Sequence, residues 1–125
     1  MKKELLSPAG DMESLLEAIH NGADAVYLAM KSFGARKFAK NFSKEEIIEA
    51  IKLCHLYGVR IYVTMNTLVK ESEVEDFLEQ VKFLHVNGVD AIIMQDFGMI
   101  SLVRKMYPNL EIHASTQANN SSLDT

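Results

Sequence analysis

Five polar side chains lie at or near the ends of predicted strands, and they are the residues best suited to chemistry. They are Asn66, Gln95, Asp96, His113 and Gln117. In parallel βα architectures the loops that follow the strands form the functional face. We therefore predict catalytic roles for Asn66, Asp96 and His113, and substrate-binding roles for Gln95 and Gln117. Two structural alternatives stay open, because Asp96 is equally well placed to cap the next helix and a histidine inside a strand is more often buried and structural.

The segment from Lys31 to Ser43 is unusual in length and charge. It holds thirteen residues, where a βα connection commonly has about two to six. Its cations alternate with aromatic residues, without an acidic residue, as Lys31, Phe33, Arg36, Lys37, Phe38, Lys40 and Phe42. Cations beside aromatic rings bind phosphates and stack bases in single-stranded nucleic-acid sites. We predict that Arg36 and Lys37 bind substrate; the alternative is a solvated loop pinned by its phenylalanines.

Common catalytic and cofactor motifs are missing from the sequence. Ser7, Ser115 and Thr116 are nucleophiles by type, but no GxSxG motif surrounds them and no base can be placed beside one. The turn after the first predicted strand reads PAGD and lacks the GxGxxG spacing of dinucleotide sites. Cys54 is the single cysteine and lies on an apolar helical stripe, so we expect it to be buried and predict no metal site in this chain.

Short apolar runs alternate with longer segments of helical period, which is the pattern of repeated βα units. The predicted strands are Glu4 to Ser7, Ala25 to Ala29, Arg60 to Met65, Ala91 to Gln95 and Glu111 to Ser115. Helices are predicted to begin at Asp11, at Ser43 with a Ser43–Glu46 capping box, and at Ser72 with a Ser72–Glu75 box. The first helix should bury Leu15, Leu16 and Ile19, and the second Ile47, Ile51 and Cys54.

A weak internal repeat supports this alternation. Similar nonapeptides begin at His20, His55 and His85, and each contains a glycine suited to the left-handed end of a helix, namely Gly22, Gly58 and Gly88. The predicted fold is the first half of a TIM-type parallel βα barrel, with about four βα units plus a fifth strand. A doubly wound open sheet is the alternative, but the polar tail after the fifth strand has no helical period to cover it.

The length, composition and net charge of the chain limit what kind of domain it can form. A closed barrel needs roughly 250 residues, so we expect residues 1–125 to be the N-terminal half of one domain, truncated at its C-terminus and inactive alone. The chain is 48% hydrophobic and 24% charged, as in ordinary globular proteins. A net charge of −4 argues against attraction of nucleic acid to the whole surface. Without a signal peptide or a long apolar run, we expect a cytoplasmic protein with no membrane contact.

Five segments, in order along nearly the whole chain, resemble the N-terminal region of the collagenase-like peptidase family U-32. They are ELLSPAGDMESL, GADAVYLAMKSFGARKFAKNFS, YVTMNTL, VDAIIMQDFGMI and IHASTQAN. The resemblance implies a barrel-like catalytic domain that continues past Thr125. It also implies a protease of unassigned mechanism for some members. For others it implies hydroxylation of RNA or of a ubiquinone precursor, with an iron–sulfur cluster and prephenate.

Three hypotheses for the function follow. The first is the N-terminal part of a U-32 peptidase that acts on peptide bonds. The alternative is an RNA-modifying hydroxylase for tRNA or rRNA, dependent on prephenate and an iron–sulfur cluster. The third is a non-catalytic binding or folding module. The resemblance places the cluster cysteines in the later half, so no cofactor is expected within this chain. The expected partners are a peptide or RNA substrate of the full-length protein, and self-association through the open barrel edge.

Overall fold

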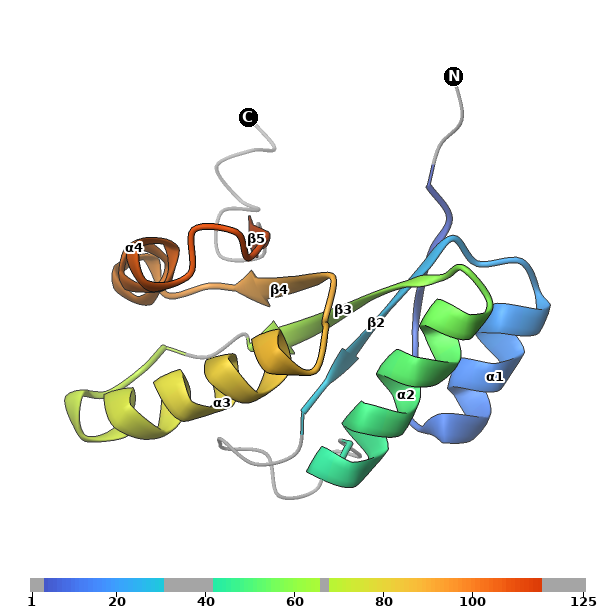
Figure 1. Ribbon diagram of the computed structural model, residues 1–125, viewed down its shortest axis with the longest axis horizontal. Helices are drawn as coiled ribbons and strands as arrows, with labels where there is room; N and C mark the ends of the chain where they lie inside the picture. The colour runs from blue at the N-terminus through green and yellow to red at the C-terminus, as the bar shows by residue number, and fades with distance from the viewer. Residues whose placement is uncertain (1–3, 31–41, 66–67, 116–125) are drawn as a thin grey trace, which may run out of the picture.

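The computed structural model describes residues 4–30, 42–65 and 68–115 (Figure 1). Strands and helices alternate along the chain, as the hydrophobic pattern predicts. In chain order they are β1 (Leu6–Pro8), α1 (Met12–His20), β2 (Ala25–Ala29), α2 (Lys44–Leu56), β3 (Arg60–Met65), η1 (Glu71–Glu73), α3 (Val74–Val86), β4 (Ala91–Met94), α4 (Phe97–Met106) and β5 (Ile112–Ala114). The predicted strands are present, with bounds that differ by up to two residues at either end.

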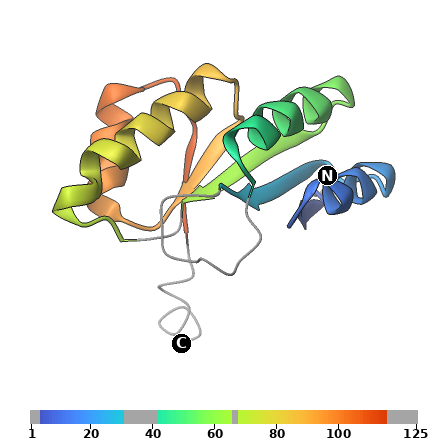
Figure 2. The same cartoon turned by 90° about the horizontal axis from the view of Figure 1, so that it is seen from below.

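The five strands form one parallel sheet in the order β1-β2-β3-β4-β5. The helices gather on one side of this sheet, and the strands curve beneath them (Figure 2). A doubly wound sheet reverses its strand order at a switch point and carries helices on both faces. A sequential order with helices on one face is instead the arrangement of a βα barrel wall. The predicted barrel-type fold is confirmed.

The core lies between the sheet and its helices. Alternate residues of β2, β3 and β4 face the helices and are almost fully buried: Val26, Leu28, Ile61, Val63, Ile92 and Met94. Residues between them on the same strands, including Ala25, Tyr62 and Ala91, form a second small cluster on the uncovered face. Because side chains alternate along a strand, one face of the sheet carries the core and the other faces the barrel interior.

The helix starts and ends follow local hydrogen bonding. Asp11 caps α1, and Ser43 and Glu46 form the predicted capping box at α2, with Glu46 N–H donating to Ser43 Oγ at 3.2 Å and Ser43 N–H to Glu46 Oε1 at 2.9 Å. The predicted box of Ser72 and Glu75 is wrong. The chain enters η1 one residue earlier, and Lys70 N–H donates to Glu73 Oε1 at 3.0 Å.

The repeat in the sequence has a structural counterpart at the opposite, N-terminal ends of the strands. Gly22, Gly58 and Gly88 have positive φ angles of 88°, 72° and 93°, as the turns from helix to strand require. The burial of Leu15 and Cys54 is confirmed. The predicted burial of Leu16 is wrong, because its side chain is 40% exposed on the flank of α1.

The polar tail after β5, from which a missing covering helix was predicted, lies outside the described residues. Within the described part of the chain, every helix is too short or too polar to cross a lipid bilayer.

Candidate functional site

The carboxyl ends of the five parallel strands meet at one edge of the sheet, which we call the strand-end edge. Its described members end a strand or follow one directly: Ala9 to Asp11, Met30, Met65, Gln95 with Asp96, and Ser115. The predicted site residues Gln95 and Asp96 therefore lie where a βα architecture holds its functional groups. Asn66, Arg36, Lys37 and Gln117 lie outside the described residues.

Asp96 joins two connections at this edge. Its Oδ1 accepts a hydrogen bond from Met99 N–H at 3.1 Å, which caps the first turn of α4. Its Oδ2 accepts one from Val69 N–H at 2.8 Å, which fixes the chain that leads from β3 to α3. The predicted helix cap is confirmed. The catalytic role of Asp96 stays a prediction, and a carboxylate that already accepts two backbone N–H groups is well suited to positioning its neighbours.

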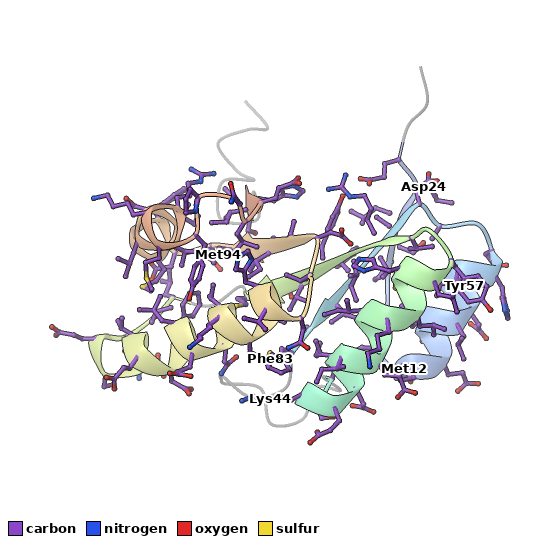
Figure 3. All side chains as sticks on the ribbon, viewed as in Figure 1. Met12, Asp24, Lys44, Tyr57, Phe83 and Met94 are labelled. Atoms are coloured by element: carbon purple, nitrogen blue, oxygen red, sulfur yellow. The ribbon has the colours of Figure 1, made fainter. Side chains whose placement is uncertain are left out.

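Gln95 follows Met94, the last residue of β4, and its side chain is half-buried. Met94 itself is buried between β4 and α4 (Figure 3). The amide of Gln95 has both a donor and an acceptor, so it can hydrogen-bond to a base edge or to a peptide. Its substrate-binding role stays a prediction.

His113 belongs to a different group, on the uncovered face of the sheet. Its Nε2 lies 2.5 Å from Glu111 Oε2, and its ring meets the Tyr62 ring edge-on at 5.1 Å. Both partners are structural neighbours within the sheet rather than members of the strand-end edge. The predicted position of His113 inside a strand is confirmed, and the structure adds the Glu111 carboxylate and the Tyr62 ring as its partners. Its catalytic role stays a prediction.

The sequence reasoning missed the rest of this inner cluster. Tyr62 Oη donates to Glu4 Oε2 at 3.0 Å, and Arg60 Nη2 donates to Glu111 Oε1 at 3.0 Å. Burial raises the pKa of the Tyr62 hydroxyl to about 12, and the hydrogen bond to Glu4 adds to this. The hydrogen bond from His113 is the main cause that lowers the pKa of Glu111 below its ordinary value.

The signal for the inner cluster was the alternation between strands. The hydrogen-bonded side chains of this cluster come from β3, from β5 and from the residues before β1 and β5, while β2 and β4 contribute Ala25, Tyr27, Ala91 and Ile93. Barrel interiors are filled in layers by side chains of alternate strands. A sequence search for polar residues at alternate positions of the first, third and fifth predicted strands would have found it.

The basic segment that follows β2 is tied to the strand-end edge at both of its ends. Met30 and Phe42 form a parallel bridge, and Phe42 N–H donates to the carbonyl of Ala29 at 3.0 Å. The Phe42 ring is 2% exposed and belongs to the core. Phe42 therefore anchors the C-terminal end of the basic segment in the core, in agreement with the pinning role considered for the phenylalanines. Met30, paired with Phe42, marks the other end of the segment, so both ends lie at the strand-end edge.

The residues of this chain do not fit an iron–sulfur cluster. Cluster irons are held by several cysteine thiolates, and this sequence has one cysteine. Cys54 is fully buried on α2, and burial raises the pKa of its thiol to about 12, so it keeps its proton. Across residues 4–30, 42–65 and 68–115, no group of three or more His, Cys, Asp or Glu side chains could hold a metal ion.

Comparisons with known proteins place these features in a family. The model of Peptidase family U32 matches residues 10–125. The chain is 45% identical, over 93% of its length, to the 23S rRNA 5-hydroxycytidine C2501 synthase of Escherichia coli and covers 17% of that protein. It is 42% identical to the uncharacterized protease MJ0090 of Methanocaldococcus jannaschii and 40% identical to tRNA hydroxylation protein P1 of Bacillus subtilis, each over 93% of this chain and 28% of the relative.

Two solved structures share the fold. The U32 peptidase Mk0906 superposes with a TM-score of 0.75 at 11% identity, over 94% of this chain and 50% of that one. The type I 3-dehydroquinate dehydratase of Clostridium difficile superposes with a TM-score of 0.58 at 13% identity, over 89% of this chain and again 50% of the other. The chain thus spans half the length of these structures and less than a third of the length of the curated relatives named above.

Proposed function

The chain belongs to peptidase family U32, and from that premise we propose that it acts in the hydroxylation of a base in tRNA or rRNA. Two relatives, at 45% and 40% identity, carry names that state this kind of reaction. The protease-named relative at 42% is called uncharacterized, so its name specifies no substrate. RNA hydroxylation is therefore supported better than peptide-bond hydrolysis.

The observation that carries the proposal is the anchoring of the basic segment at the strand-end edge. Met30 and Phe42 hold its two ends together there, beside the loops expected to form the functional face. The sequence between them supplies four cations and no acidic residue. A positive segment at the functional edge attracts a phosphate backbone even though the whole chain is net negative.

We further propose that the strand-end edge provides the substrate-positioning part of the reaction. Gln95 offers hydrogen bonds to a base, Arg36 and Lys37 bind phosphates, and Asp96 fixes the connections that follow β3 and β4. Any iron–sulfur cluster would supply the oxidation chemistry, and its ligands would have to come from outside these 125 residues, because Cys54 cannot serve. Among residues 4–30, 42–65 and 68–115, β1 and β5 each pair with one strand only, and such open edges favour self-association, which light scattering on this chain measures.

The test is the loss and restoration of a hydroxylated nucleoside. The gene is deleted, and nucleosides from separately purified tRNA and rRNA are compared with those of the parent strain by mass spectrometry. We expect one nucleoside to lose 16 mass units in the deletion strain and to regain them when the intact gene is returned. Unchanged nucleosides in both RNA pools would rule the proposal out, and gelatin hydrolysis that survives repurification would favour the peptidase alternative.

A paired charge variant localises the effect. Arg36→Ala with Lys37→Ala should lower the hydroxylated fraction, because both cations leave the proposed phosphate contact. The matched control is Lys52→Ala with Lys82→Ala, which removes two exposed cations from α2 and α3. Equal losses for the two pairs would show that net charge, rather than the basic segment, controls the reaction.

A further inference from the structure

We draw no further inference here: the strongest candidate, the inner cluster of Glu4, Tyr62, Arg60, Glu111 and His113 on the uncovered face of the sheet, has side chains that already bond to one another, and nothing among residues 4–30, 42–65 and 68–115 shows what covers that face in a fold of which the chain spans half.

Discussion

Replacing Asp96 with alanine should destabilise the fold more than the loss of an ordinary helix cap. The variant removes the cap of α4, worth about 1 kcal/mol, and leaves the partly buried N–H of Val69 without its acceptor at 2.8 Å. An unsatisfied buried donor costs about 1–3 kcal/mol. The expected loss in the free energy of unfolding is therefore about 2–4 kcal/mol.

The matched variant is Ser43→Ala, because Ser43 caps α2 and its Oγ accepts only the N–H of Glu46 among the described hydrogen bonds. It should cost about 1 kcal/mol. Urea unfolding at pH 7, followed by far-ultraviolet circular dichroism, gives both free energies. Asp96→Asn should fall between the two, because its amide keeps one carbonyl oxygen for one of the two N–H groups. A loss for Asp96→Ala no larger than that for Ser43→Ala would refute the bridging role of this carboxylate.

Three further outcomes follow from the titratable groups. Because the pKa of Tyr62 is raised to about 12, its contribution to stability should be lost as pH rises from about 10 through 12; ultraviolet titration of Tyr62→Phe should lack that late step, and an identical titration contradicts the assignment. Because the pKa of Glu111 is lowered from 4.5, its contribution should be lost as pH falls below that value; acid unfolding of Glu111→Gln should be less pH-dependent, and equal slopes argue against the His113 contact. The buried Cys54 thiol, with a pKa of about 12, should react with a disulfide reagent only after unfolding in urea, so rapid labelling of the folded protein contradicts its burial.

The fold could be predicted from the sequence because its determinants are local. The alternation of apolar runs, the glycines that end helices and the Ser43–Glu46 box each depend on a few neighbouring residues, and all three are present. The predicted start of α3 was wrong because Glu73 and Glu75, two residues apart, both have the spacing of a capping residue relative to a residue three positions earlier. The hydrogen bond from Lys70 N–H to Glu73, rather than a bond within the Ser72–Glu75 pair, sets the observed start.

The site could be predicted only in part, because its contacts join residues far apart in sequence. Capping by Asp96 depends on Met99, three residues away, and was foreseen. The bond to Val69 crosses 27 residues, and that from Tyr62 to Glu4 crosses 58. No periodicity specifies such pairs. Their geometry depends on strand register and barrel curvature, which place β1, β3 and β5 in one layer.

The inner cluster and the strand-end edge differ in whether their side chains already have hydrogen-bond partners. In the inner cluster, Glu4, Tyr62, Arg60 and Glu111 already bond to one another. A ligand would have to displace those bonds, and each broken bond to a charged group costs about 1.5–3 kcal/mol. The strand-end edge differs, since Asp96 satisfies backbone donors while the Phe97 ring stays 64% exposed. Binding at that edge gains contacts without breaking any described ones, so the polar groups of the inner cluster are better suited to stability than to binding.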